Sequence, residues 1–193
     1  MDRVVGLANA SIVALWVVWL AGWTAAAFFV KRVQRRERVS AILLERVPVM
    51  IGFLMLVLPN RLPFALTRRF LHETPSLALA ALAAVAVGLG IAVWARLHLG
   101  RNWSGQVIVR MGHSLVTSGP YRRVRHPIYA GMTVALAGTA LAIGAPYAFV
   151  ALGLILFGFL VRVRLEEALM RETFPNDYDA YRRRTARLIP GVF

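Results

Sequence analysis

The sequence contains no cysteine, and this absence excludes disulfide bonds, thiolate metal sites, a cysteine nucleophile and palmitoylation. Acidic residues are also scarce, with 9 Asp and Glu against 23 Lys and Arg in 193 residues. Charged residues make up 17% of the chain, less than the roughly 25% of ordinary soluble domains. His98, His113 and His126 lack thiol or paired-carboxylate neighbours at ligand spacing, so no metal site is predicted.

Hydrophobic residues make up 59% of the chain, and the mean hydropathy is +0.62. The formal net charge is nevertheless +14, and the basic residues are segregated from the apolar stretches. This combination indicates an integral membrane protein and argues against nucleic acid as a partner. We expect an all-α fold in a single membrane domain, 1–193, with N-terminal spans in 1–76 and a functional core in 77–193.

The apolar stretches predict about five transmembrane helices. The longest stretch would measure about 51 Å as one helix, against a hydrocarbon core of about 30 Å. It must therefore turn, and the predicted turn is Gly144-Ala145-Pro146, which makes the last two spans a tight hairpin. The four stretches are Val4–Val30, Val39–Leu58, Leu77–Trp94 and Ile128–Val161.

The second stretch is interrupted by Glu45, Arg46 and Pro48. A charged pair inside an apolar run lies either near the membrane interface or against protein within the helix bundle. We expect the first of these for Glu45 and Arg46.

The basic residues predict the topology. Five follow the first span, six lie in 95–127 and seven in 162–193, so 18 of the 23 fall on one side of the membrane. By the positive-inside rule the N-terminus faces out and the C-terminus faces the cytosol. Anionic lipids of the inner leaflet are the expected neighbours of these side chains.

Four groups of residues on the predicted cytosolic side carry functional groups. Pro127 is suited to the first turn of a helix, so His126 is predicted at or near a helix N-cap. The groups are Gln106 with His113–Tyr121, Arg125–Gly131, Arg162 with Glu166 and Glu167, and Phe174 with Tyr178 and Tyr181.

Each group also has a purely structural interpretation. Arg162 and Glu166, four residues apart, fit a surface ion pair, although Arg before Glu is the less favourable order on an isolated helix. Glu167 is expected to be solvated. Phe174, Tyr178 and Tyr181, spaced four and three along a helix, are expected to pack the C-terminal tail against the protein.

Taken together, the order and spacing of these groups resemble the isoprenylcysteine carboxyl methyltransferase family, and in particular its short five-span prokaryotic members. The resemblance covers about residues 94–193. It rests on the elements Leu-Val-Thr-Ser-Gly-Pro-Tyr and Arg-His-Pro-x-Tyr-x-Gly within His113–Tyr129, followed by Arg162, Glu166-Glu167 and Phe-x-x-x-Tyr. The first two spans match the family only in hydropathy.

The resemblance implies S-adenosylmethionine as cofactor, in a cytosolic pocket formed by the 95–127 loop, the start of the fourth span and the C-terminal helices. Arg162 and Glu166 match the substrate-side pair of the family, and Ser114 stands where the family has Thr. The positions that match cofactor-binding residues are Gln106, His113, Ser114, Leu115, Val116, Tyr121, His126, Pro127, Ile128 and Tyr129.

The chemistry fits these residue types. A carboxylate acceptor is already a nucleophile at neutral pH, so methyl transfer to it needs alignment rather than a general base. Orientation alone contributes about 7–11 kcal/mol to such reactions. Arg162 is suited to hold the acceptor carboxylate in two parallel hydrogen bonds, and Glu166 to orient Arg162 or offset its charge. The predicted reaction is O-methylation of the α-carboxylate of an isoprenylcysteine or a similar lipid.

Three alternatives stay open at the level of sequence. A phospholipid N-methyltransferase shares the cofactor elements, but its amine acceptor needs a base and is repelled by Arg162. A sterol-type membrane reductase with a similar C-terminal architecture uses NADPH. A non-enzymatic membrane scaffold would use its arginines only to bind anionic lipid. In each case we expect a monomer.

Overall fold

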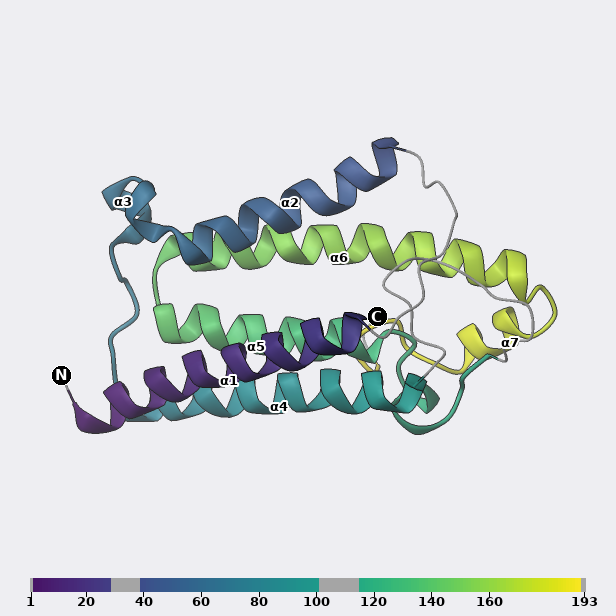
Figure 1. Cartoon of the computed structure of the whole chain (residues 1–193), viewed down its shortest axis with the longest axis horizontal. Helices are drawn as coiled ribbons and strands as arrows, with labels where there is room; N and C mark the ends of the chain where they lie inside the picture. Colours follow the sequence, from purple (N-terminus) through teal and green to yellow (C-terminus); the bar gives the residue numbers. More distant parts are fainter. Residues whose placement is uncertain (1, 29–38, 101–114, 192–193) are drawn as a thin grey trace.

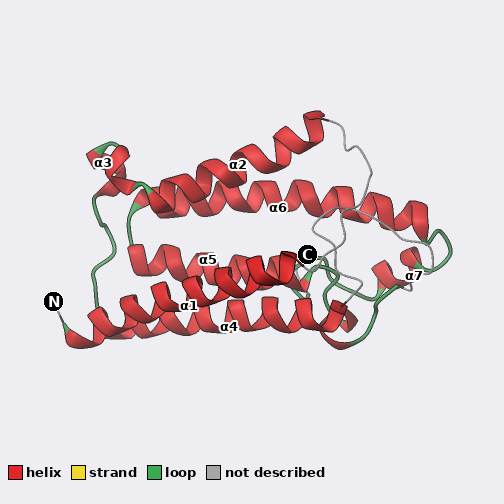
Figure 2. Cartoon of the chain, in the orientation of Figure 1, coloured by secondary structure: helices red, strands yellow, loops and turns green. Residues whose placement is uncertain are grey.

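The computed structural model describes residues 2–28, 39–100 and 115–191, and all regular structure in these ranges is helical (Figure 2). Five long helices run along the long axis of the molecule and alternate in direction (Figure 1). They are α1 (Arg3–Phe28), α2 (Val39–Val57), α4 (Pro75–Leu99), α5 (Pro127–Ile143) and α6 (Pro146–Thr173).

Short helices lie at the two ends of this bundle. At one end, α3 (Phe64–Thr67) follows η1 (Pro59–Arg61), near the turn between α5 and α6. At the other end, η3 (Gly119–Arg122) precedes α5, and α7 (Tyr178–Arg183) follows α6. The segments that carry the predicted site therefore gather at one end of the molecule (Figure 1).

Among the described residues, three helices are long and apolar enough to cross a membrane: α1 over Arg3–Ala26, α4 and α6. The apolar helix α5 is shorter, at 17 residues. The chain is a multi-pass membrane protein. With 28 residues α6 is about 42 Å long, which exceeds the hydrocarbon core of about 30 Å. The C-terminal part of α6, which is rich in charged residues, therefore extends toward the membrane boundary.

Proline and glycine set the ends of these helices. Pro75, Pro127 and Pro146 each occupy the first turn of a long helix, where a missing N–H is tolerated. Gly144 ends α5 in the left-handed conformation (φ 64°), which a residue without a side chain adopts at little cost. The chain thus turns between α5 and α6 at the place where the sequence predicts a turn.

The helices pack in two closely fitted pairs, α4 with α5 and α2 with α6. Gly88 of α4 faces Gly131 of α5, and a Cβ atom on Gly88 would lie 2.4 Å from the carbonyl oxygen of Gly131. In the second pair, a Cβ atom on Gly158 would lie 2.6 Å from the carbonyl oxygen of Glu45. Small residues thus let the backbones approach closely, as expected where apolar burial does not drive association in lipid.

Candidate active site

Four of the predicted site residues meet where α5 begins and α6 leaves its apolar stretch. Tyr129 donates a hydrogen bond of 2.8 Å from its hydroxyl to Oε1 of Glu166, and Nε of Arg162 donates one of 2.9 Å to the same oxygen. His126 is the N-cap residue of α5, as predicted, and its Nδ1 lies 3.4 Å from Oε2 of Glu166. Glu166 thus has three partners from two helices.

Arg162 is buried, with its side chain only 7% exposed, and it has two carboxylate partners. The second is Glu45 of α2, whose Oε2 lies 3.2 Å from Nη1 of Arg162. The Glu45 side chain is 14% exposed and faces protein within the bundle, which is the second of the two positions considered for it. A lone guanidinium or carboxylate among apolar helices is costly, and pairing α2 with α6 satisfies both.

Glu167 is also buried, at 3% exposure, so the expectation that it is solvated is wrong. Its two oxygens accept hydrogen bonds of 2.9 Å from Nε of Arg125 and from Nη2 of Arg187. Nε2 of His126 lies 3.6 Å from Oε1 of Glu167. Two arginines and a histidine therefore offset the cost of burying this carboxylate.

The electrostatic environment of His126 follows from these neighbours. Burial alone would lower the pKa of His126, but contacts with Glu166 and Glu167 outweigh it, so the pKa is raised above its ordinary value. Burial raises the pKa of the Tyr121 phenol, and the nearby charge of Glu166 adds to this effect. The Tyr121 hydroxyl is therefore protonated at neutral pH.

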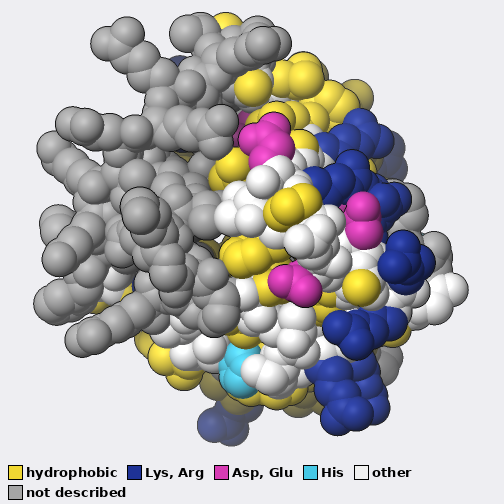
Figure 3. Space-filling view, turned by 90° about the vertical axis from the view of Figure 1, so that its right-hand side faces the viewer, with side chains coloured by type: hydrophobic (Ala, Val, Ile, Leu, Met, Phe, Trp, Pro, Cys, Tyr) yellow, Lys and Arg dark blue, Asp and Glu magenta, His cyan; other side chains and the backbone are white. Residues whose placement is uncertain are grey.

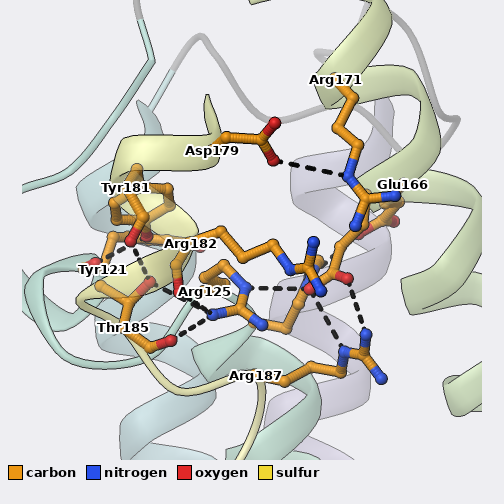
Figure 4. Close-up of polar contacts among 11 residues, drawn as sticks. Tyr121, Arg125, Glu166, Arg171, Asp179, Tyr181, Arg182, Thr185 and Arg187 are labelled. Carbon is orange, nitrogen blue, oxygen red and sulfur yellow. Dashed lines mark hydrogen bonds and ion pairs between the residues drawn. The ribbon is translucent and has the colours of Figure 1, made fainter. Parts of the chain in front are cut away.

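The C-terminal tail is fastened to the start of α5 by backbone and side-chain bonds. The backbone N–H groups of Arg125 and His126 donate to the carbonyls of Ala186 and Arg187, at 2.9 and 3.1 Å. Nη1 of Arg125 donates to the carbonyl oxygen of Thr185 (Figure 4). The N-cap position of α5 is thus held by the tail as well as by α6.

The tail tyrosines pack as expected, but not on one helix. Phe174 is the C-cap of α6, whereas Tyr178 begins α7 and Tyr181 lies one turn later, so the prediction of one continuous helical spacing is wrong. Tyr178 and Tyr181 are both buried. The hydroxyl of Tyr181 donates a 2.6 Å hydrogen bond to the carbonyl of Tyr121, and burial raises the pKa of Tyr181 to about 12.

The other predicted cofactor positions fall in two classes. Gln106, His113 and Ser114 lie outside the described residues. Leu115 and Val116 are half-buried in an irregular segment before η3, Tyr121 is buried within η3, Pro127 is the buried first residue of α5, and Ile128 packs against the apolar core between α4 and α5.

Four residues complete the cluster beyond the predicted site residues. Arg125 and Glu167 belong to the groups singled out in the sequence but had no assigned role, whereas Glu45 and Arg187 were not predicted. A signal was present for Glu45, because a carboxylate within an apolar span is by default a candidate for a buried partner or a functional role. Glu167 and its two arginines lie far apart in sequence, and nothing local to any of them indicates the contact.

The end of the molecule that carries the cluster is strongly basic. Figure 3 views this end and shows Lys and Arg side chains gathered on one side of it. The exposed arginines of the described segments there are Arg122, Arg123, Arg164, Arg171, Arg182, Arg183 and Arg184.

The described cluster combines charged and polar groups, as a polar cofactor requires. The Glu166 side chain is 25% exposed, and both of its oxygens have partners within the cluster. Nε2 of His126 and the hydroxyl of Tyr178 are buried and make no hydrogen bond within the described part of the chain. Buried polar atoms of this kind ordinarily have a hydrogen-bond partner, and Nε2 of His126 has only the longer contact of 3.6 Å with Glu167.

Comparison with known proteins identifies the core of the chain. Residues 79–172 match the sequence profile of the isoprenylcysteine carboxyl methyltransferase (ICMT) family. This part of the chain is similar to that family. The match includes α5, nearly all of α6, and with them His126, Tyr129, Arg162 and Glu166.

Individual relatives within the ICMT family agree with this assignment. A probable protein-S-isoprenylcysteine O-methyltransferase of Oryza sativa subsp. indica is 33% identical over 81 residues, which are 42% of this chain and 42% of the relative. Protein-S-isoprenylcysteine O-methyltransferase of Schizosaccharomyces pombe is 35% identical over 81 residues, 42% of this chain and 34% of the relative. Protein-S-isoprenylcysteine O-methyltransferase B of Arabidopsis thaliana is 29% identical over 96 residues, which are 48% of this chain and 49% of the relative. The chain thus spans less than half the length of these relatives.

Proposed function

We propose that this protein is an S-adenosylmethionine-dependent methyltransferase that O-methylates the carboxylate of an isoprenylcysteine or a similar lipid. The observation that carries the proposal is the buried guanidinium of Arg162, fixed by Glu166 at the point where α6 leaves its apolar stretch. A fixed cation at the end of the apolar stretch of α6 is suited to a lipid acceptor. The lipid chain of such an acceptor stays in the membrane, while its carboxylate reaches the membrane boundary. The names of the relatives support the same reaction.

In this proposal Arg162 binds the acceptor carboxylate and Glu166 orients Arg162. The hydrogen bond from Tyr129 and the contact with His126 hold Glu166 in place, and Glu166 thereby fixes the orientation of the Arg162 guanidinium. The carboxylate is a nucleophile without deprotonation, so these residues need to align it and exclude water rather than remove a proton.

S-adenosylmethionine supplies an electrophilic methyl group bound to a sulfonium. We propose that the first turn of α5 and the segment before it hold this cofactor, through Leu115, Val116, Tyr121, His126, Pro127, Ile128 and Tyr129, together with Gln106, His113 and Ser114. The position of His126 at the start of α5 and the 25% exposure of the Glu166 side chain beside it support this assignment.

We further propose that all five long helices cross the membrane, with α5 and α6 as a hairpin, the N-terminus outside and the basic end in the cytosol of a prokaryotic cell. The alternation of the five helices in Figure 1 and the exposed arginines at one end support this arrangement. Anionic lipid headgroups are the proposed neighbours of these arginines, and the proposed oligomeric state is a monomer.

The relatives named above are O-methyltransferases, so the comparisons do not favour the phospholipid N-methyltransferase, the NADPH-dependent reductase or the non-enzymatic scaffold.

The proposal is tested on detergent-purified protein by calorimetry with S-adenosylhomocysteine and by methyl transfer to an S-prenylcysteine with a free carboxylate. Arg162→Ala is expected to lower kcat/KM for the acceptor at least about 100-fold, since it removes one side of a buried charge pair. Cofactor binding by Arg162→Ala should stay unchanged, which also shows that the variant is folded.

Arg164→Ala is the matched control, because Arg164 lies two residues along α6 and is exposed. It should retain activity. If folded wild-type protein binds no S-adenosylhomocysteine, the proposed function is wrong. If Arg162→Ala loses cofactor binding and transfer together, Arg162 belongs to the cofactor site instead.

A further inference from the structure

Glu45 lies outside the segment that matches the ICMT family, yet its carboxylate contacts the centre of the cluster. Both of its oxygens are within hydrogen-bond distance of Nη1 of Arg162, at 3.2 and 3.4 Å. Glu45 belongs to α2 and Arg162 to α6, 117 residues apart. The contact is not needed to neutralise Arg162, because Glu166 already pairs with the same guanidinium.

The two carboxylates that contact Arg162 are held very differently. Glu166 has three side-chain partners, namely Arg162, Tyr129 and His126. The only side-chain partner of Glu45 among the described residues is Arg162. Glu166 is therefore fixed, whereas Glu45 needs to give up only one ion pair in order to move away.

Movement of the helix that carries Glu45 is restricted at the same place. The carbonyl of Glu45 lies against Gly158, where even a Cβ atom would come within 2.6 Å, and Val49 lies against the same glycine. The α2 backbone is thus packed directly on α6 one turn before Arg162. An exchange of partners at Arg162 therefore requires only rotation of the Glu45 side chain.

The balance of charge at Arg162 indicates which of its two carboxylate partners is exchanged. With Glu45 and Glu166 both bound, one guanidinium already faces two carboxylates. A third carboxylate at the same cation would add repulsion in a poorly solvated environment. An incoming carboxylate is therefore accommodated best if it replaces the partner that is held least.

We propose that Glu45 is an exchangeable counter-ion that occupies the acceptor position on Arg162 until an acceptor carboxylate displaces it. This inference rests on the proposed function. It also explains product release: esterification removes the negative charge of the acceptor, so the ester no longer competes with Glu45 for Arg162. Glu45 can then return to Arg162, and the ester lacks the ion pair that held the acid.

The test measures binding of an S-prenylcysteine and of its methyl ester to detergent-purified protein, with no methyl donor present. Glu45→Gln keeps the size and hydrogen-bonding capacity of the side chain but removes its charge, so it competes weakly for Arg162. The Kd of the acid is expected to fall at least about fivefold, because a larger fraction of the protein has an accessible Arg162. The Kd of the ester should change less than twofold.

Turnover provides a second readout. In Glu45→Gln, KM for the acid should fall while kcat stays within twofold, a separation that loss of a structural contact does not produce. Glu73→Gln is the matched control, because Glu73 pairs with Arg69 at the far end of the bundle. It should leave both Kd values unchanged.

Two results would overturn the inference. A higher Kd for the acid in Glu45→Gln would make Glu45 a residue that positions Arg162, and unchanged values for acid and ester would remove Glu45 from acceptor binding. Failure of the proposed function looks different: wild-type protein would then bind neither compound, or would bind them without methyl transfer when the donor is supplied.

Discussion

Single side chains around Glu166 determine the direction in which Arg162 points. Glu166 accepts from Tyr129 and Arg162 at the same oxygen, while its other oxygen faces His126. Because these bonds come from α5 and α6, the carboxylate connects the two helices at the site. Removing Tyr129 or His126 as a partner of Glu166 should let the guanidinium of Arg162 move, without unfolding the helix bundle.

Tyr129→Phe tests this connection. The change removes one hydrogen bond to a charged group, which typically contributes about 1.5–3 kcal/mol. We expect kcat for a carboxylate acceptor to fall about tenfold or more in steady-state methyl transfer assays. Tyr147→Phe is the control, since Tyr147 lies at the other end of α6, and it should retain wild-type kcat. Equal kcat in wild type and Tyr129→Phe would contradict the role assigned to Glu166.

Protonation of His126 should stabilise the fold in a defined pH range. The pKa of His126 is raised in the folded protein, so the folded state binds the proton more tightly than the unfolded state. The stabilisation is fully present below the unfolded pKa of about 6.5 and is lost as the pH rises through the higher folded pKa. The Tm difference between wild type and His126→Gln should therefore be larger at about pH 6 than at about pH 9.

Thermal unfolding in detergent measures this difference, with His72→Gln, a change at an exposed histidine, as the control. The control should show no such pH dependence. A Tm difference that grows with rising pH would mean that neutral His126 is the favoured form, and would contradict the proposed contacts with Glu166 and Glu167.

At the scale of helices, the close pairing of α2 with α6 is what brings Glu45 to Arg162. Gly158→Val should push the helices apart, because its Cβ would lie 2.4 Å from Cγ2 of Val49 and 2.6 Å from a backbone carbonyl that cannot rotate away. Overpacking of this kind costs about 1–3 kcal/mol. The expected result is a lower Tm and weaker acceptor binding.

Gly153→Val, on the same helix, is the matched control. A Cβ atom at Gly153 meets nothing within 4 Å, so this variant should keep the wild-type Tm and acceptor affinity. If Gly158→Val and Gly153→Val lower the Tm equally, the cost arises from β-branching within a helix and not from the contact between α2 and α6.

The helices were predictable to different degrees, for physical reasons. The starts of α5 and α6 and the turn at Gly144 follow from proline and glycine, whose backbone preferences act locally. The burial of Glu45 and Glu167 could not be derived in this way, because their partners lie 117 and 42 residues away. Residues that pair across the bundle are visible in sequence only as charges that an apolar environment must compensate.

The distribution of charge over the whole molecule underlies the proposed orientation. The exposed arginines of η3, α6 and α7 gather at the end that holds the cluster, whereas Arg61 and Arg68 lie toward the other end with η1 and α3. A polar cofactor and a lipid acceptor can reach one site only where water and membrane meet. In the proposed function the basic end is therefore the side from which the cofactor arrives.

The absence of cysteine allows this orientation to be tested directly, since any single cysteine introduced is the only thiol in the protein. Arg183→Cys in α7 and Arg61→Cys in η1 place exposed thiols at opposite ends of the molecule. In intact bacterial cells with a permeabilised outer envelope, a membrane-impermeant maleimide should label Arg61→Cys and leave Arg183→Cys unmodified. After the inner membrane is disrupted, both variants should be labelled, which confirms that both thiols are reactive. Labelling of Arg183→Cys but not of Arg61→Cys in intact cells would invert the topology and place the cofactor site on the wrong side of the membrane for S-adenosylmethionine.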